Sequence, residues 1–490
     1  MSEKLKVGIL GGTGMVGQRF ISLLENHPWF EVTTIAASPR SAGKTYEEAV
    51  GDRWKMDTPM PEAVKKIVVM NVNEVEKVAA EVDFVFSAVD MTKEEIKKIE
   101  EEYAKTETPV VSNNSAHRWT PDVPMVVPEI NPEHMEVIRY QRERLGTKRG
   151  FVAVKPNCSI QSYAPVLTAW KEFEPYEVVA TTYQAISGAG KTFKDWPEMV
   201  GNIIPYIGGE EEKSEKEPLR IWGHIDDEKK EIVPAASPVI TCQCIRVPVL
   251  NGHTAAVFVK FKKKPTKEQL IEALRNYSGV PQELNLPSAP KQFIQYLEED
   301  NRPQISLDVN FENGMGISVG RLREDTVYDW KFVGLSHNTV RGAAGGAVLC
   351  AELLKESLDA DAFEIEMKVP YSDNYRECVA QAREDLQKNH LPELKIMPES
   401  IADYDVVILG YPNYCSTIPM PVATFLDAYD FSGKKILPFC TNEGSGMGVS
   451  EADIKKYVPG ADVEEGLSVN GSKARESKKL LEDWVKKLLG

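Results

Sequence analysis

The stretch Lys6-Val7-Gly8-Ile9-Leu10, followed by Gly11-Gly12-Thr13-Gly14-Met15-Val16-Gly17, decides the fold of the N-terminal part of this chain. A short apolar run leads into a glycine-rich turn, and an amphipathic stretch over 16–24 follows. The glycines let the backbone approach a pyrophosphate, and the helix behind them offers free N–H groups at the positive end of its dipole. The pattern predicts a dinucleotide site; the alternative is a tight turn with only a structural role. The expected contacts in this loop are Gly11, Thr13, Gly14, Met15 and Val16.

The end of the second expected strand indicates which dinucleotide binds. An NAD site usually carries Asp or Glu there to hold the ribose 2′-hydroxyl, whereas this chain has Ala36-Ala37-Ser38-Pro39-Arg40-Ser41. Hydroxyls and a guanidinium suit a 2′-phosphate, so we expect NADP, with Ser38, Arg40 and Ser41 near that group. Ser38 and Arg40 could instead be ordinary loop residues.

Strands and helices alternate through the first 150 residues. Further β-rich runs at 30–37, 67–72, 83–89 and 109–112, with a charged helix at 93–105, predict a doubly wound parallel sheet of Rossmann type. Longer β-rich runs follow, at 178–186, 240–248 and 254–261, and the runs 305–310 and 316–322 continue this β character. They predict a mixed α+β domain with a large, mostly antiparallel sheet.

Composition excludes several classes of function. The 490 residues suggest roughly three domains at about 150 residues each. A net charge of −16 argues against binding nucleic acid, which needs a basic face. The seven cysteines show neither the spacing of a disulfide framework nor that of a metal site, so we expect no metal. No apolar run is long enough to cross a membrane and no signal peptide is evident, so we expect a cytoplasmic protein.

Lys155-Pro156-Asn157-Cys158-Ser159 joins an apolar strand at 151–154 to a helical pattern over 160–170. A thiol at a helix N-terminus is expected to have a lowered pKa, and the Cys158 N–H would point toward an oxyanion on the attacked carbon. We therefore expect Cys158 to be a nucleophile, the alternative being a buried core cysteine.

A hairpin around Asn251-Gly252 is expected to bring Arg246 close to His253. An imidazole near a thiolate can act as general base and acid, and a guanidinium can hold a carboxylate through two hydrogen bonds. The alternative for His253 is a hydrogen-bonded turn histidine.

Several motifs together resemble the aspartate-semialdehyde dehydrogenase family. They are the runs Pro156-Asn157-Cys158-Ser159, Tyr183-Gln184-Ala185-Ile186-Ser187-Gly188-Ala189-Gly190 and Arg246-Val247-Pro248-Val249-x-x-Gly252-His253. The runs Ser112-Asn113-Asn114-Ser115-Ala116-His117-Arg118 and Gly209-Glu210-Glu211-Glu212-Lys213 favour the archaeal and fungal branch. The resemblance covers about residues 1–357.

The resemblance implies NADPH-dependent reduction of L-4-aspartyl phosphate to L-aspartate 4-semialdehyde, with inorganic phosphate released. Cys158 would form the thioester and His253 would move the proton. The remaining implied contacts are Gln184 to the acyl group, Arg246 to the α-carboxylate, Glu210 to the ammonium, Arg118 and Lys213 to phosphate, Asn157 to the substrate, and Ser87, Ser187, Gly188 and Asn338 to the cofactor. Asn338 or Thr339 would also cap the helix over 340–357. Each charged residue could instead be a solvated surface charge.

Three other functions fit the sequence less well. A malonyl-CoA reductase-like enzyme would use the same scaffold, but its acyl group carries no ammonium for Glu210 to bind. An acetylglutamyl-phosphate reductase would need room for a larger substrate. A non-catalytic NADP-sensing scaffold would not need the set Cys158, Gln184, Arg246 and His253. The family suggests a homodimer or homotetramer.

Residues 358–490 lie beyond this resemblance and have their own βα rhythm. Runs at 405–409 and 434–439, each followed by a polar loop, and a closing helix at 480–489 resemble a flavodoxin. A flavodoxin's first strand and phosphate-binding loop are missing, and the tail begins where the second strand would, at 362–369. The missing strand is an interior one, so its absence leaves unpaired edges. The helix over 340–357 would replace the flavodoxin's first helix, so that the two folds share it.

These patterns predict three parts: an NADP-binding Rossmann domain (1–155 and 337–357), a catalytic and dimerisation domain (156–336), and a partial flavodoxin-like α/β segment (358–490). We expect the tail to lack FMN and to serve as a docking or oligomer-contact module. The alternative is a flavin electron carrier that feeds the dehydrogenase.

Overall fold

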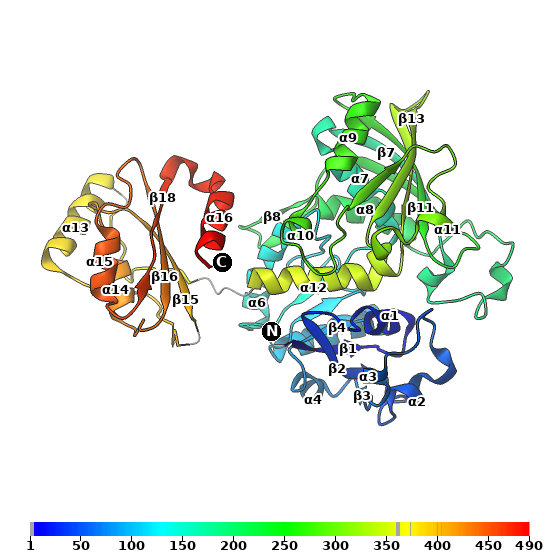
Figure 1. Ribbon diagram of the computed structural model, residues 1–490, viewed down its shortest axis with the longest axis horizontal. Helices are drawn as coiled ribbons and strands as arrows, with labels where there is room; N and C mark the ends of the chain where they lie inside the picture. The colour runs from blue at the N-terminus through cyan, green and yellow to red at the C-terminus, as the bar shows by residue number, and fades with distance from the viewer. Residues whose placement is uncertain (1–3, 359–362, 373, 399, 403, 490) are drawn as a thin grey trace. The chain divides into compact units, whose positions relative to one another are not determined.

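The computed structural model describes residues 4–358, 363–372, 374–398, 400–402 and 404–489. The chain forms two compact units, residues 1–359 and 360–490 (Figure 1). The first unit contains two large sheets and the second contains one, and each unit is described by itself.

The first sheet is entirely parallel, with the strand order β3-β2-β1-β4-β5-β6. Its strands are β1 (Leu5–Leu10), β2 (Phe30–Ala37), β3 (Met70–Asn71), β4 (Phe84–Ser87), β5 (Val110–Ser112) and β6 (Val152–Val154). Leu10 pairs with Ala36 on one side and with Ser87 on the other. The loops that follow β1, β2 and β4 therefore open at the same edge, where doubly wound sheets bind ligands.

Helices connect these strands. They are α1 (Met15–Leu23), α2 (Tyr46–Val50), α3 (Glu62–Lys65), α4 (Val75–Ala79), α5 (Lys93–Lys105) and α6 (Ile138–Leu145). In α5, the Thr92 hydroxyl accepts from the Glu95 N–H, and the Glu95 carboxylate accepts from the Thr92 N–H. This capping box begins the helix, and the spacing of Ile96, Ile99 and Tyr103 buries one face.

The second sheet has the order β10-β7-β11-β14-β13-β12 and is mostly antiparallel, as predicted. Its strands are β7 (Pro175–Gln184), β10 (Val239–Arg246), β11 (His253–Phe261), β12 (Ile294–Leu297), β13 (Ile317–Glu324) and β14 (Trp330–Ser336), and β8 (His224–Asp226) pairs separately with β9 (Glu231–Val233). The helices of this region are α7 (Ala164–Ala169), α8 (Glu210–Ile221), α9 (Lys267–Asn276), α10 (Val280–Glu283) and α11 (Ile305–Asp308). The prediction of a strand at 305–310 was wrong, because α11 occupies most of that run.

The predicted hairpin between β10 and β11 does not form. β7 lies between them, parallel to β10 and antiparallel to β11. The N–H groups of Ile186 and Ser187, just after β7, donate to the carbonyls of Val249 and Leu250. The connecting loop therefore crosses the end of β7, and the tight-turn signal at Asn251-Gly252 lies in that crossing loop.

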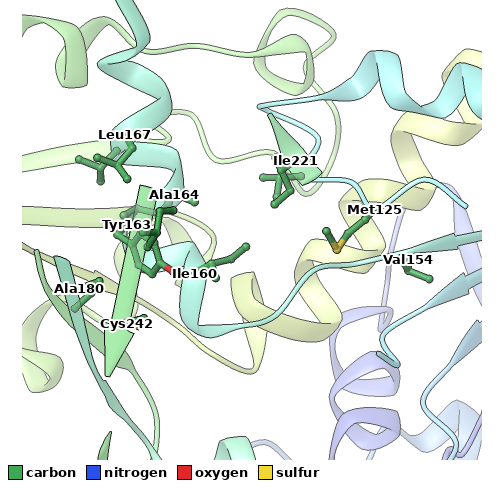
Figure 2. Close-up of a cluster of buried hydrophobic side chains, with 14 of the residues drawn as sticks. Met125, Val154, Ile160, Tyr163, Ala164, Leu167, Ala180, Ile221 and Cys242 are labelled. Atoms are coloured by element: carbon green, nitrogen blue, oxygen red, sulfur yellow. The ribbon is translucent and has the colours of Figure 1, made fainter. Parts of the chain in front are cut away.

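A large hydrophobic cluster lies beneath the turn that follows Cys158. Ile160 and Tyr163, from that turn, are fully buried with Ala180 of β7 and Cys242 of β10 (Figure 2). Cys242 and Cys244 lie on the same face of β10 as small buried side chains, which agrees with their sequence spacing. Packing of these side chains thus holds the turn that follows Cys158 against the second sheet.

Helix α12 (Gly345–Leu358) belongs to the core of the first unit. Leu349, Leu353 and Leu354 are buried in a cluster with residues from the first sheet. A π-helical turn, Val340–Ala344, precedes it. The prediction that the two folds share this helix stays a prediction.

The second unit contains a parallel sheet in which β16 pairs with β15, β17 and β18. Its elements are α13 (Tyr375–Lys388), β15 (Val406–Pro412), α14 (Met420–Asp427), β16 (Lys435–Asn442), α15 (Ser450–Tyr457), β17 (Asp462–Val463), β18 (Leu467–Asn470) and α16 (Lys478–Leu489). A separate hydrophobic cluster includes Leu409, Phe425 and Ile436. Within the described part of this unit, β15 pairs with β16 alone, so its other edge is open.

The predicted strand at 362–369 does not form over its described residues, 363–369, and Ala362 lies outside them. Met367 makes a single antiparallel bridge with Leu394. The apolar residues of this run resemble a strand in sequence, but no ladder is present there among the described residues to satisfy the run's backbone groups.

Candidate active site

Cys158 and His253 face one another, although 95 positions separate them in the chain. The Cys158 Sγ lies 3.4 Å from the His253 Nε2. Cys158 is partly exposed and precedes a single 3-10 turn, Ser159–Ser162. The backbone of Tyr163 is not helical, so it separates this turn from α7. The helical pattern predicted over 160–170 is therefore confirmed in part, as this turn followed by α7, and the expected helix dipole is reduced to that of one turn.

The pKa of the Cys158 thiol shifts in the direction opposite to the one predicted from the sequence. Loss of hydration, and then the Glu210 carboxylate, raise the pKa of Cys158 to about 11, against the opposing effects of Lys155, Arg118 and Arg246. Burial, followed by the charge of Arg246, lowers the pKa of His253 to about 3. Both groups are therefore neutral at pH 7 when no ligand is bound.

The hydrogen bonds of His253 define its tautomer. The Ala185 N–H donates to His253 Nδ1 at 3.1 Å, so a neutral ring carries its proton on Nε2. This Nε2–H points at the Cys158 sulfur. The pair is arranged so that the histidine can donate a hydrogen bond to a thiolate or to an oxygen next to it.

Gln184 and Arg246 lie at the ends of neighbouring strands, because they pair across β7 and β10. Both side chains are buried. The Arg246 Nη1 donates to the Ala185 carbonyl at 2.5 Å, and burial lowers the pKa of Arg246 without making it neutral at pH 7. A β-carbon at Gly188 would lie 3.1 Å from Arg246 Nη1 and 3.2 Å from His253 Nε2, so Arg246 and His253 meet around this glycine.

Glu210, at the start of α8, contacts three other predicted site residues. Its carboxylate accepts from Asn157 Nδ2 at 2.9 Å, from Lys213 Nζ at 2.7 Å and from Gln184 Nε2 at 3.4 Å. Burial alone would raise the pKa of Glu210, but Lys213 and Asn157 outweigh it and the net shift is downward. Glu210 is thus a buried carboxylate beside the thiol.

Arg118 is held by Glu217, which the sequence analysis did not identify. The Arg118 Nη1 donates to Glu217 Oε1 at 3.0 Å, and its Nε donates to the Lys155 carbonyl at 3.0 Å. The second Glu217 oxygen accepts from the Asn157 backbone N–H at 2.6 Å. Glu217 lies in the same charge-rich run as Glu210, seven residues further along one helix face, and this spacing was the available signal.

Lys155 is a second residue whose environment the sequence analysis missed. It is buried, and its Nζ donates to the carbonyls of Pro156 and Gly342. Burial lowers its pKa to about 7. Gly342 packs so closely that an added β-carbon would lie 2.7 Å from the Cys158 Cβ. These residues pack against the nucleophile from the side of the first sheet.

The glycine loop after β1 has the geometry of a phosphate cradle. Gly11 has φ +80°, and a β-carbon there would lie 2.3 Å from the Ala88 carbonyl oxygen. No side chain caps α1 at Gly14, so the N–H groups of Met15 and Val16 in its first turn have no cap partner. The Thr13 carbonyl accepts from Gln18 Nε2, which fixes the loop. Uncapped donors at this sheet edge fit a pyrophosphate.

The other predicted cofactor residues fall into two groups. Ser38 and Arg40 are exposed after β2, and the Ser41 N–H donates to the Ser38 carbonyl in a turn. Ser87, at the end of β4, is fully buried, and its hydroxyl accepts from Asn114 Nδ2. Ser38 and Arg40 are open to a ligand, Ser41 is buried, and the hydroxyl of Ser87 contacts Asn114.

Asn338 connects two loops rather than capping a helix. Its Oδ1 accepts from the Gly252 N–H at 2.8 Å, and its Nδ2 donates to Ser187 Oγ at 2.8 Å. Thr339 is the cap residue of the following turn but makes no side-chain cap hydrogen bond. The capping role predicted for these two residues was wrong, because Asn338 is held by the loops after β7 and β10.

Two kinds of feature are absent from the residues that the structure describes. They contain no group of three or more acidic, histidine or cysteine side chains arranged to hold a metal ion. None of their helices is long and apolar enough to cross a membrane.

Comparisons with known families and proteins agree with this geometry. A family model described as semialdehyde dehydrogenase, NAD binding domain, matches residues 6–138, and one described as semialdehyde dehydrogenase, dimerisation domain, matches 165–341. A flavodoxin family model matches 339–488, so it begins just before the turn that leads into α12.

Individual relatives match over most of their own length. The chain is 42% identical to the aspartate-semialdehyde dehydrogenase of Methanothermobacter thermautotrophicus over 359 residues, which are 72% of this chain and 100% of that protein. It is 41% identical to the Saccharomyces cerevisiae enzyme over 365 residues, 72% of this chain and 98% of that one. The crystal structure of the Candida albicans enzyme with NADP matches with a TM-score of 0.65 at 40% identity, covering 72% of this chain and 99% of that chain. The chain therefore belongs to the aspartate-semialdehyde dehydrogenase family.

Proposed function

We propose that this chain catalyses the NADP-dependent reductive dephosphorylation of L-4-aspartyl phosphate to L-aspartate 4-semialdehyde. The observation that carries the proposal is the approach of Cys158 to His253 at 3.4 Å, beside the buried side chains of Gln184, Glu210 and Arg246. The nucleophile thus lies beside a hydrogen-bond donor, beside a carboxylate that can bind an ammonium group, and beside a guanidinium that can bind a carboxylate. Family membership supports the same activity.

In this proposal the Cys158 sulfur attacks the acyl carbon while its thiol proton passes to the departing phosphate, and a thioester forms as the acyl carbon–oxygen bond to phosphate breaks. Arg118 and Lys213 hold the departing phosphate, and the Cys158 N–H and Gln184 orient the acyl oxygen. When bound, the NADPH supplies the hydride that reduces the acyl group. His253 Nε2–H stabilises charge on the sulfur or on the adjacent oxygen, and the sulfur leaves again as thiolate when the aldehyde is released.

The charged residues favour an aspartyl substrate over malonyl-CoA. Glu210 is a buried carboxylate, and it would bind the substrate ammonium, in place of part of its contact with Lys213. Arg246 would bind the α-carboxylate. A malonyl group brings no cation, so it would leave the Glu210 charge without that partner.

The residues of the glycine loop, the exposed Ser38 and Arg40, and the buried Ser41 would hold NADP. The uncapped N–H groups of Met15 and Val16 would bind the pyrophosphate, and Arg40 would bind the 2′-phosphate. Ser187, Gly188 and Asn338, which line the loops beside His253, would contact the nicotinamide end.

The decisive assay is phosphate-dependent reduction of NADP with aspartate semialdehyde, comparing the natural chain with Cys158→Ala. We expect the variant to lose at least about a thousandfold in kcat, because the thioester cannot form. Cys415→Ala removes an exposed cysteine from the second unit and is the matched control. Activity that survives in Cys158→Ala would overturn the mechanism.

We further propose that the chain forms at least a homodimer through the second sheet. Val239 on β10 is 68% exposed and Tyr183 on β7 is 37% exposed, on the face opposite to the buried residues of these strands. Exposed apolar side chains on a sheet face support association, and the match to a dimerisation domain supports the same region. A homotetramer would need a second contact surface.

We propose that the second unit serves as a docking or oligomer-contact module rather than as a flavin carrier. The open edge of β15 supports this proposal, because it offers unpaired backbone groups to another chain. Asn442 Oδ1 accepts from the N–H groups of Gly444 and Gly446, so this loop is ordered by its own residues. A yellow flavin absorbance band in the purified protein would contradict the proposal; we expect none.

A further inference from the structure

Glu217 is a buried carboxylate that joins two parts of the site. It is 1% exposed and lies on α8. One oxygen accepts from the Arg118 guanidinium at 3.0 Å, and the other accepts from the Asn157 N–H at 2.6 Å, one residue before Cys158. One side chain thus fixes both a cation and the loop that carries the nucleophile.

Arg118 is oriented by contacts on two of its edges. Its Nε donates to the Lys155 carbonyl and its Nη1 to Glu217, while an Nη2–H makes a longer contact of 3.4 Å with the Asn113 carbonyl. Five N–H donors in a rigid fork are available to a guanidinium, so these contacts leave donors on its outer edge. The direction of those remaining donors depends on Glu217.

We propose that Glu217 is a positioning residue that aims Arg118 at the phosphate group and holds it in register with Cys158. The inference rests on the proposed function, in which Arg118 binds the phosphate of the substrate. Since α8 also carries Glu210 and Lys213, one helix sets the positions of the phosphate-binding and ammonium-binding groups relative to the sulfur. Glu217 acts through Arg118 and Asn157.

A glutamine cannot replace this carboxylate without losing a hydrogen bond. Both Glu217 oxygens accept, one from Arg118 and one from the Asn157 N–H. The amide of Glu217→Gln would place its NH₂ against one of these two donors, whichever way it is turned. Arg118 or the Asn157 backbone must then move away.

The test is steady-state kinetics in the phosphate-consuming direction, with aspartate semialdehyde, NADP and inorganic phosphate. We expect Glu217→Gln to raise KM for phosphate about tenfold, because a charge-assisted hydrogen bond that orients the cation is lost. KM for NADP should stay within about twofold, since the cofactor loop is separate. A merely structural role would change all the kinetic constants together and would not single out phosphate.

Glu212→Gln on the exposed face of the same helix is the matched control, because Glu212 pairs with Lys216 at the surface. Its phosphate KM should not change. Arg118→Gln tests the underlying function separately. If Arg118→Gln raises phosphate KM and Glu217→Gln does not, the positioning role alone fails; if neither does, the phosphate role of Arg118 fails as well.

Glu217→Asp is the second variant, in case Glu217→Gln does not fold. It keeps the charge but shortens the side chain, so it can reach Arg118 or Asn157 less well than glutamate does. We expect a phosphate KM about threefold higher, with kcat less affected. An unchanged phosphate KM in a folded Glu217→Asp, or failure of both variants to fold, would overturn the proposal.

Discussion

At the scale of single residues, the site is organised by buried charges rather than by the thiol alone. Glu210 carries a negative charge near Cys158, and the neighbouring cations Lys155, Arg118 and Arg246 oppose its effect on the sulfur. A substrate that brings an ammonium and a phosphate would alter this balance, because its ammonium neutralises Glu210. The substrate phosphate and α-carboxylate would act in the opposite sense, by binding Arg118 and Arg246, which lower the pKa of Cys158.

Alkylation of Cys158 in the ligand-free enzyme should depend steeply on pH. The pKa of Cys158 is raised to about 11, so the thiolate fraction grows about tenfold per pH unit throughout the neutral and mildly alkaline range. We expect the iodoacetamide rate to rise from pH 7 to pH 10, with Cys158→Ser giving the background from other cysteines. A rate that is already at its plateau at pH 7 would show that the pKa is lowered instead.

At the scale of elements, one face of α8 braces the turn that carries the nucleophile. Glu210 holds the Asn157 side chain, Ser214 bonds the Ser159 hydroxyl at 3.0 Å, and Glu217 holds the Asn157 N–H. These side chains recur at a spacing of three or four residues, which places them on one helix face. A short turn without a long helix behind it is thereby kept in place.

The glycine turn before α1 supplies an element-scale prediction. A β-carbon at Gly17 would lie 2.4 Å from the Gly11 carbonyl oxygen and 2.6 Å from the Gly12 Cα, so the loop must shift. We expect Gly17→Ala to weaken NADP binding at least about tenfold, measured by titration of the folded enzyme. Ser22→Ala, at an exposed contact on the same helix, is the control. Unchanged NADP affinity in Gly17→Ala would contradict the cradle.

At the scale of the whole molecule, the chain combines a dehydrogenase unit with a second unit that has its own hydrophobic core. The clusters of the first unit reach as far as Leu354, and the cluster of the second unit spans residues 365–463. The relative from M. thermautotrophicus matches over its full length, and the match covers 72% of this chain. The first unit thus contains every residue that the proposed chemistry uses.

A chain ending at residue 358 should keep its activity. We expect kcat/KM within about twofold of the full chain, because separate cores fold independently. It should still sediment as at least a dimer, since the exposed face around Val239 and Tyr183 remains. If the full chain is a tetramer, the shortened chain should be a dimer, because the proposed contact module is gone. Inactive but folded truncated protein would assign the second unit a part in catalysis, and a monomer would overturn the proposed dimer face.

Local patterns in the sequence were sufficient for several of the regular elements. The alternation of apolar runs and turns predicted β2 at 30–37 and α5 at 93–105 with the observed bounds, and the helical signal at 480–489 lies within α16. The glycine spacing before α1 predicted a strand–turn–helix unit, because tight approach of backbone excludes side chains there. Residue types such as Cys158, His253 and Arg246 likewise named candidate chemistry before any geometry was known.

Only the tertiary structure decided how these residues meet. Sequence adjacency suggested that β10 and β11 pair, but β7 lies between them, since pairing partners are chosen by the whole sheet. The pKa of Cys158 rises instead of falling because burial and the Glu210 charge outweigh one short turn of helix dipole. The sequence does not distinguish Glu217 from the other charged residues of α8, because its role depends on the packing of α8 against the Cys158 turn. Local sequence patterns thus predicted many of the elements and the candidate groups, because these depend on neighbouring residues, whereas long-range packing set the distances, charges and partners of those groups.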